Sequence, residues 1–243
     1  MAKIIVISGA STGIGAETAH LLAEGNQIFI HYNASRERAE QTATEVQERG
    51  GTAHLVQADL FGEAGCDALY SAVSVMTNRI DVLVNNAGGL VERQSIGQLE
   101  WDLLERVFSL NTFSTMLLTS LFVPLLQKGT NPCIVNISSV AARHGSPTAT
   151  AYGAAKGAID SFTRGAAAEL APDIRVNAVA PGVIETPFHE RYSTPERMKQ
   201  FRANTPLKRN GRTVDVAKAI AFLIDNEFIT GETIDVNGGL FMR

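Results

Sequence analysis

Short runs of apolar residues alternate along the chain with longer stretches in which apolar and polar residues recur at helical spacing. Each short run is rich in β-branched residues and apolar at nearly every position, which is typical of a parallel strand covered on both faces. We therefore expect strands at 3–8, 27–32, 52–57, 80–85, 132–138, 174–180 and 233–238. Amphipathic helices are expected between them, among other places at 14–25, 35–50, 100–128 and 152–171.

This alternation predicts a single α/β domain over residues 1–243. Strand–helix–strand units with short links build a parallel sheet through right-handed crossovers, with helices on both faces. The expected fold is a doubly wound, seven-stranded sheet, since no linker, repeat or low-complexity tract divides the chain. The segment 186–212 departs from the alternation and contains Pro187, Pro195 and Pro206. We expect it to form a flap over a site.

Composition narrows the class of protein. Apolar residues make up 45% and charged residues 19% of the chain, which is ordinary for a folded domain. The net charge of -4 gives no basis for binding nucleic acid or an anionic membrane, and no apolar run reaches the roughly 18 residues of a spanning helix. Cys66 and Cys133 are far apart without neighbouring histidines. We expect reduced thiols, no metal site and a cytoplasmic location.

Three glycines, Gly9, Gly13 and Gly15, follow the first predicted strand and open the first predicted helix. A loop without side chains lets the phosphates of a nucleotide approach backbone N–H groups and the positive end of the helix dipole. The spacing G-x-x-x-G-x-G differs from the common dinucleotide fingerprint. A tight strand–helix turn without a ligand therefore remains an alternative.

Polar and glycine residues also follow several other predicted strands. They lie at 58–60, 85–89, 138–139 and 180–186. The carboxyl ends of parallel strands share one edge of the sheet, and doubly wound folds bind their ligands at that edge. The sequence therefore predicts a nucleotide site there.

Tyr152 and Lys156 lie four residues apart in an alanine-rich segment that is expected to be helical. This spacing puts both side chains on one face, one turn apart. A lysine ammonium beside a phenol favours the phenolate, so we expect the pKa of Tyr152 to fall from about 10 toward the working pH. Such a tyrosine can give a proton to a carbonyl oxygen or take one from an alcohol. Taken alone, the pair also fits a half-buried tyrosine and an exposed lysine on an ordinary helix.

Five motifs, in order along the whole chain, resemble those of the short-chain dehydrogenase/reductase family, which has the Rossmann fold. The glycine loop at 9–15 is similar to the family's loop, and Asn85-Asn86-Ala87-Gly88 is similar to its motif after the fourth strand. The positions of its catalytic tetrad are matched by Asn111, Ser139, Tyr152 and Lys156. Pro181-Gly182 followed by Thr186 resembles the motif that holds the nicotinamide carboxamide.

The resemblance implies an oxidoreductase that interconverts the carbonyl and alcohol forms of a small-molecule substrate. Tyr152 would be the general acid/base, and Lys156 would lower its pKa and bind the nicotinamide ribose. Ser139 would donate a hydrogen bond to the substrate carbonyl, and Asn111 would hold a water that relays protons to Lys156. Two plainer roles stay open: Asn111 could satisfy helix backbone, and Ser139 could cap a loop.

The resemblance also implies which residues contact the cofactor. In chain order they are Gly9, Ser11, Thr12, Gly13, Ile14, Gly15, Tyr32, Asn33, Ser35, Arg36, Asp59, Leu60, Asn86, Ala87, Gly88, Tyr152, Lys156, Pro181, Gly182, Ile184 and Thr186.

The end of the second strand bears on the choice between NADP(H) and NAD(H). An acidic residue there would bind both ribose hydroxyls and repel a 2′-phosphate, but residues 31–36 contain none. Asn33, Ser35 and Arg36 could instead contact the phosphate. Against this, Thr12 stands where many NADP(H)-dependent members of the family have an arginine. We expect NADP(H), with NAD(H) as the alternative.

The substrate stays open. The segments 180–186 and 230–243 resemble β-ketoacyl-acyl-carrier-protein reductases, so a 3-oxoacyl thioester is one candidate. The basic residues that dock the carrier in that subgroup are replaced around 129–131 and 171–173. Arg143 and His144 are expected to line the substrate mouth and are polar for an acyl chain. The flap is locally basic, which suits an anionic substrate or simply a solvated surface.

Other functions and an oligomeric state are also considered. The alternatives are another alcohol or sugar dehydrogenase that uses NAD, a non-catalytic dinucleotide-binding sensor, and an epimerase or dehydratase. The intact Ser139, Tyr152 and Lys156 argue against a sensor. The apolar tail at 236–243 and the long helices predict a homotetramer, because family members with similar tails pack these elements across two-fold axes.

Overall fold

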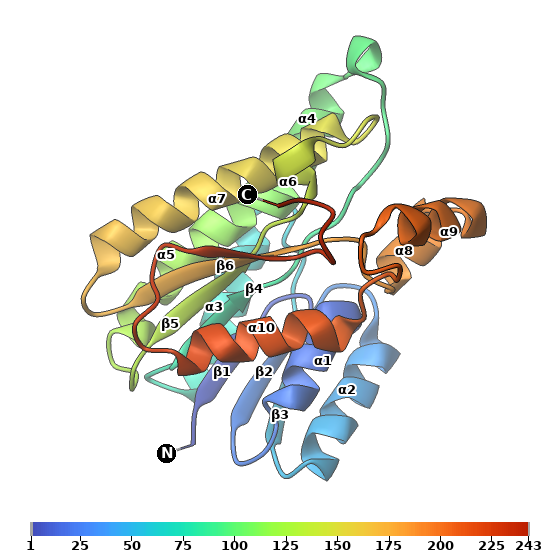
Figure 1. Ribbon diagram of the computed structural model, residues 1–243. Coiled ribbons are helices and arrows are strands. Elements are labelled where there is room, and N and C mark those ends of the chain that lie inside the picture. Colours follow the sequence, from blue (N-terminus) through green and yellow to red (C-terminus); the bar gives the residue numbers. More distant parts are fainter. Residues whose placement is uncertain (1, 243) are drawn as a thin grey trace.

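Seven parallel strands form the sheet at the centre of the protein (Figure 1). The computed structural model describes residues 2–242, apart from the side chains of 189–191. The strand order is β3-β2-β1-β4-β5-β6-β7. The strands are β1 (Ile4–Ile7), β2 (Gln27–Tyr32), β3 (Thr52–Gln57), β4 (Val82–Asn85), β5 (Cys133–Ile137), β6 (Arg175–Pro181) and β7 (Thr233–Val236). Every strand predicted from the sequence is confirmed, with ends that agree to within two residues.

Helices connect the strands and cover both faces of the sheet. They are α1 (Gly13–Leu21), α2 (Arg36–Glu48), α3 (Glu63–Met76), η1 (Ile96–Gln98), α4 (Trp101–Phe108), η2 (Ser109–Phe113), α5 (Ser114–Leu126), α6 (Ala141–His144), α7 (Thr150–Leu170), α8 (Pro187–Tyr192), α9 (Pro195–Asn204) and α10 (Thr213–Asp225). The fold is the predicted doubly wound Rossmann fold in a single domain. Because all the strands are parallel, their carboxyl ends lie at one edge of the sheet.

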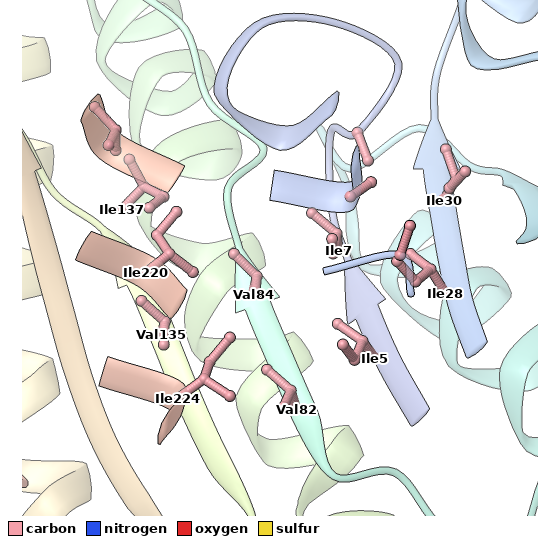
Figure 2. Close-up of a cluster of buried hydrophobic side chains, with 14 of the residues drawn as sticks. Ile5, Ile7, Ile28, Ile30, Val82, Val84, Val135, Ile137, Ile220 and Ile224 are labelled. Atoms are coloured by element: carbon pink, nitrogen blue, oxygen red, sulfur yellow. The ribbon is translucent and has the colours of Figure 1, made fainter. Parts of the chain in front are cut away.

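Alternate residues of each strand point to opposite faces, so the sheet has two apolar layers. Figure 2 shows one layer, which contains isoleucines and valines of β1, β2, β4 and β5. Ile220 and Ile224 of α10 lie over the β4 and β5 part of this layer. Helices α1 and α2 complete this side. The other layer packs against α3, α5 and α7, with Phe29 and Phe122 as its largest buried side chains. Because helices cover both faces of the sheet, the central strands are apolar at nearly every position of their sequence.

One continuous helix runs from Trp101 to Leu126 through α4, η2 and α5. By length and composition it is apolar enough to cross a membrane, which the sequence analysis did not predict. Half of its most apolar window is buried inside the protein, and α5 packs against α3, β4 and β5. A core helix passes the same test, so this feature is weak support for a membrane span.

The flap at 186–212 is more regular than its sequence indicates. Figure 1 shows α8 and α9 standing apart from the sheet beyond the end of β6. Pro187 and Pro195 begin these helices, where the missing N–H costs no hydrogen bond, and Pro206 lies just beyond the end of α9. The prolines therefore do not prevent helix formation in the flap. None of the residues of α9 is buried.

Candidate functional site

A cleft of about 810 Å³ lies along the carboxyl ends of the strands and extends under the flap. Among its lining residues are most of those predicted for the site: Gly9, Ser11, Thr12, Gly13, Ile14, Tyr32, Asn33, Ser35, Asp59, Leu60, Asn86, Ala87, Gly88, Ser139, Tyr152, Lys156, Pro181, Gly182, Ile184 and Thr186. Three predicted residues, Gly15, Arg36 and Asn111, do not line it. The fold thus brings sequence-distant strand ends into one cavity, as expected for a doubly wound sheet.

The glycine loop is locked to the end of β4. Asn86 Nδ2 donates to the carbonyl oxygens of Ser8 and Gly9 at 2.9 and 2.8 Å. The Ser8 hydroxyl accepts from the backbone N–H groups of Asn86 and Ala87, both at 3.0 Å. A Cβ on Gly15 would lie 2.5 Å from Asn86 Nδ2 and 2.5 Å from the Gly9 oxygen. Gly15 is therefore required by close packing behind the cleft.

The beginning of α1 opens toward the cleft. Thr12 is the N-cap residue and its side chain makes no capping hydrogen bond. Gly13 follows with a φ of +63°, a left-handed conformation that favours glycine. The first N–H groups of a helix have no intrahelical partner and carry the positive end of its dipole. A bare loop against such a helix end fits the pyrophosphate of a dinucleotide.

His31 supports the same loop and was missed by the sequence analysis. Its Nδ1 accepts from the Gly9 N–H at 2.9 Å, so Nε2 carries the proton and donates to the Ala58 oxygen at 3.1 Å. The ring is buried, and burial lowers its pKa. A neutral imidazole thus ties the loop after β1 to the end of β3. The one sequence signal for this role was the presence of a histidine within the otherwise apolar strand β2.

Asn111 lies in the π-helical turn η2, between α4 and α5. Its Nδ2 donates to the carbonyl oxygens of Gly89 and Val107 at 2.8 and 2.9 Å, and its Oδ1 accepts from the Gly89 N–H at 3.0 Å. The side chain therefore satisfies backbone groups, which is the plainer of the two roles considered for it. A Cβ on Gly88 would lie 2.8 Å from Asn111 Oδ1 and 3.0 Å from Lys156 Nζ. Gly88 thus leaves room where these two side chains approach each other.

Ser139, Tyr152 and Lys156 meet at the wall of the cleft. Ser139 follows β5, and its hydroxyl accepts from the Ala141 N–H at 3.1 Å and hydrogen-bonds with Tyr152. Lys156, one turn after Tyr152 on α7, donates from Nζ to the Ile137 oxygen at 2.8 Å. Nζ lies 5.9 Å from the centre of the Tyr152 ring. Helix α7 thus holds both side chains on one face, as the spacing predicts.

The acidities of this pair differ from the sequence-based expectation. Burial raises the pKa of Tyr152 above its ordinary value, and the hydrogen bond from Ser139 opposes that rise. Burial also lowers the pKa of Lys156 to about 8, while Asp160 acts in the opposite direction. The expected fall in the pKa of Tyr152 was wrong for the protein alone, because removing a phenol from water disfavours its anion.

Arg143 was expected at the substrate mouth but does not line the cleft. Its Nη1 lies 3.0 Å from Asp160 Oδ2, and its Nε lies 3.2 Å from Asp235 Oδ1. The side chain is only 14% exposed, so it forms a buried link between α6, α7 and β7. His144, the next residue, does line the cleft. The expectation for Arg143 was wrong because its paired acids lie behind the cleft wall.

The far end of the cleft is lined by polar groups that follow β2 and β3. Asn33 Nδ2 donates to Asp59 Oδ1 at 3.2 Å, and Ser35 lies in the same wall. Arg36 instead pairs with Glu40 on the exposed side of α2, with 2.8 Å between Nε and Oε1. The structure therefore brings Asn33 and Ser35 to the cleft and leaves Arg36 outside its lining.

Comparison with known proteins gives the same class that the fold and the cleft define, a dinucleotide-binding oxidoreductase. A family profile described as "Enoyl-(Acyl carrier protein) reductase" matches residues 9–241. The chain belongs to the short-chain dehydrogenase/reductase family, and it is an NAD(P)-dependent enzyme of that type.

Three similar proteins cover nearly the whole chain. A cyclopentanol dehydrogenase of Comamonas sp. (strain NCIMB 9872) is 34% identical, over 98% of this chain and 96% of its own. The crystal structure of the angucycline C-6 ketoreductase LanV with bound NADP has a TM-score of 0.91 and 27% identity, covering 98% of this chain and 95% of that one. The NADH-dependent reductase A1-R′, responsible for alginate metabolism, has a TM-score of 0.91 and 29% identity, covering 100% and 98%.

Proposed function

We propose that this protein is an NADP(H)-dependent oxidoreductase that interconverts a ketone and a secondary alcohol, with Tyr152 as the general acid/base. The observation that carries the proposal is the hydrogen bond between Ser139 and Tyr152 beside the buried Lys156, in a cleft at the carboxyl edge of the sheet. A cofactor-binding protein without catalytic activity has no need of a proton donor there. The similar ketoreductase and cyclopentanol dehydrogenase support the same reaction type.

The residues of the cleft fit a nicotinamide dinucleotide. Gly9, Gly13 and the start of α1 would hold the pyrophosphate. Asn86 and Gly88 would face the central part of the cofactor, and the turn at 181–186 would hold the carboxamide. The bound nicotinamide would supply or accept the hydride, while the protein orients the reactants.

The protein's own contribution is to position and move protons. In the reductive direction, the Tyr152 hydroxyl would give its proton to the carbonyl oxygen as the carbonyl carbon gains a hydride, which yields the alcohol. The Ser139 hydroxyl would donate to the same oxygen and stabilise its developing negative charge. The Lys156 ammonium, held by the Ile137 oxygen, would stabilise the phenolate that remains and take part in its reprotonation.

NADP(H) is proposed as the preferred cofactor. Asn33 and Ser35 line the end of the cleft after β2, and no residue of β2 or of the turn that follows it is acidic before Glu37. Small polar groups at this place can donate hydrogen bonds to a 2′-phosphate. The similar LanV structure holds NADP, whereas A1-R′ is described as NADH-dependent. Asp59, bonded to Asn33, is the group most able to weaken this preference.

We also propose a cytoplasmic homotetramer. Trp101 and Phe113 are 79% and 55% exposed along the α4–α5 helix, which is more apolar surface than a solvent-facing helix needs. Met242, in the C-terminal tail, is 72% exposed. Two-fold contacts over these surfaces would cover them. Light scattering at micromolar concentration should give four times the 26.0 kDa chain mass, and a stable monomer would refute this assembly.

A substrate panel tests the proposed reaction. The purified protein is mixed with NADPH or NADH and with cyclic ketones, 3-oxoacyl thioesters or keto sugars, and nicotinamide absorbance is followed. We expect turnover of at least one class of ketone, faster with NADPH. A 3-oxoacyl thioester is a specific candidate, and its preference over simple ketones would define the protein as a 3-oxoacyl reductase. Tight cofactor binding without turnover of any carbonyl or alcohol would instead indicate a sensor.

A further inference from the structure

Two arginines line the cleft at the end where the flap lies over Tyr152. Arg93 belongs to the loop after β4, and Arg197 belongs to α9 of the flap. Both are half-buried, and neither forms an ion pair with a described acidic side chain. We propose that Arg93 and Arg197 form a subsite for an anionic group of the substrate, a carboxylate or a phosphate carried by the same molecule as the reacting carbonyl. This inference rests on the proposed function.

The hydrogen bonds of Arg93 leave part of its guanidinium available. Nη1 donates to the Thr148 hydroxyl at 3.3 Å. Nε is buried and has no hydrogen-bond partner among the described residues. A buried donor without an acceptor is destabilising, and more so when the donor is charged. A surface arginine would satisfy this group with water, so the buried Nε argues against a merely solvated basic surface.

The two guanidinium groups act on each other. Burial lowers the pKa of Arg93, and the charge of Arg197 lowers it further. Arg197 also lies over the Phe201 ring, with 5.4 Å from its guanidinium carbon to the ring centre. Two like charges held near each other in a half-buried place are unfavourable for the protein alone. An anion bound between them would reverse the sign of that interaction.

The subsite lies within reach of the reacting groups. Tyr192 of α8 donates to the Val91 oxygen at 3.4 Å, which ties the flap to the loop that carries Arg93. The Phe188 ring of α8 lies 6.2 Å from the Tyr152 ring. The flap and the loop therefore enclose the space beside Tyr152. A substrate held there would present its carbonyl to Tyr152 and its charge to the arginines.

The other charges of the cleft do not cancel this positive region. Asp59, which follows β3, is the only acidic side chain among the described lining residues. It accepts a hydrogen bond from Asn33. Strands β2 and β1 separate β3 from β4, which precedes Arg93. Lys156 adds positive charge beside Tyr152. The cleft is thus positive at its substrate end, which favours an anion there.

Matched substrates test the proposal. Initial rates are measured with NADPH for 3-oxobutanoate, 4-oxopentanoate and phenylglyoxylate, each beside its methyl ester, and for dihydroxyacetone phosphate beside dihydroxyacetone. The variants are Arg93→Gln and Arg197→Gln, with Arg202→Gln as the control because Arg202 lies on the same helix, is exposed and does not line the cleft. The carboxylate and phosphate pairs distinguish the two kinds of anion.

We expect the wild-type protein to prefer the charged member of at least one pair. Each cleft variant should lower kcat/KM for that anion by about 10-fold to 100-fold, the effect of losing one hydrogen bond to a charged group, and leave the neutral partner and the Arg202→Gln rates unchanged. Equal kcat/KM for charged and neutral partners in the wild type would overturn the subsite and leave the proposed function standing. The subsite would also be overturned if Arg93→Gln and Arg197→Gln lowered kcat/KM equally for the charged and the neutral member of a pair. If Arg93→Gln does not fold, Arg93→Lys keeps the charge and should retain part of the preference.

A binding measurement separates this proposal from the proposed reaction. The melting temperature of the protein saturated with NADP⁺ is measured with malonate or inorganic phosphate against chloride at equal ionic strength. Malonate or phosphate should raise it in the wild type and in Arg202→Gln, and not in Arg93→Gln. This pattern would support an anion site even if no ketone in the panel were reduced. The same rise in Arg93→Gln as in the wild type would refute the subsite.

Discussion

Replacing Lys156 with methionine should stabilise the protein while abolishing its turnover. Lys156 is 3% exposed, and burial lowers the pKa of its ammonium from 10.5 to about 8. That difference corresponds to about 3 kcal/mol of unfolding free energy lost at about pH 7. Methionine carries no charge, so it removes this cost. It also leaves the Ile137 oxygen without its hydrogen bond from Nζ, and this loss reduces the gain in stability by about 1 kcal/mol. A net gain of about 2 kcal/mol is expected.

The gain should depend on pH with a definite sign. The pKa of Lys156 is lower in the folded protein than in the unfolded chain, so the unfolded chain binds more protons between the two values. The destabilisation by Lys156 is therefore complete below about pH 8 and is lost as the pH rises toward about 10.5. The advantage of Lys156→Met over the wild type should shrink nearly to zero by about pH 10.

Urea unfolding at a fixed protein concentration, at about pH 7 and about pH 9.5, measures this difference. Other titrating groups are common to both proteins and cancel in the comparison. Lys218→Met, at an exposed position on α10, is the control and should change stability by less than about 0.5 kcal/mol. A Lys156→Met variant less stable than the wild type at about pH 7, or a difference independent of pH, would show that the buried charge of Lys156 does not destabilise the protein.

Three further predictions concern the loop, the cofactor and the flap. Gly15→Ala should lower the free energy of unfolding by about 1–3 kcal/mol, because its Cβ would overlap Asn86 and the Gly9 oxygen; Gly97→Ala, with open space around it among the described residues, is the control, and equal stability of the two variants would contradict the packing argument. Asn33→Asp should lower kcat/KM for NADPH relative to NADH by repelling the 2′-phosphate, and an unchanged ratio would remove Asn33 from that contact. Hydrogen exchange in α9, which buries no residue, should be fast without ligands and slower with cofactor and substrate; protection equal to that of β6 under both conditions would show that the flap is a fixed wall.

The sheet was predictable because its central strands are buried on both faces. A continuous apolar run such as Ile4–Ile7 is typical of a strand buried in the middle of a sheet. The glycine and polar residues that follow such runs indicate the edge of the sheet where a ligand binds. The spacing of Tyr152 and Lys156 likewise determines one helix face, whatever lies around it. These features depend on local pattern alone.

Features that depend on long-range contacts were not predictable. Arg143 lies in a polar segment after β5. Only the fold shows that it pairs with Asp160 and Asp235 and so does not line the cleft. His31 and Arg93 belong to no local motif, and they reach the site through β2 and through the loop after β4. The acidity of Tyr152 depends on burial, which spacing does not reveal. A proline breaks a helix in its interior but is tolerated at the first position. Pro187 and Pro195 occupy first positions, which the sequence pattern did not reveal.

The role of Tyr152 as the proton donor is tested most directly by the rate of ketone reduction by Tyr152→Phe, which removes one hydroxyl and keeps the ring beside Phe188. Turnover is followed by nicotinamide absorbance, and cofactor binding is measured separately by fluorescence titration. Tyr70→Phe is the control, since Tyr70 packs against Phe122 in the core and does not line the cleft. We expect kcat to fall by about 10²–10⁴-fold and the cofactor affinity to stay unchanged. A kcat for Tyr152→Phe close to that of Tyr70→Phe would contradict the assignment of Tyr152 as the proton donor.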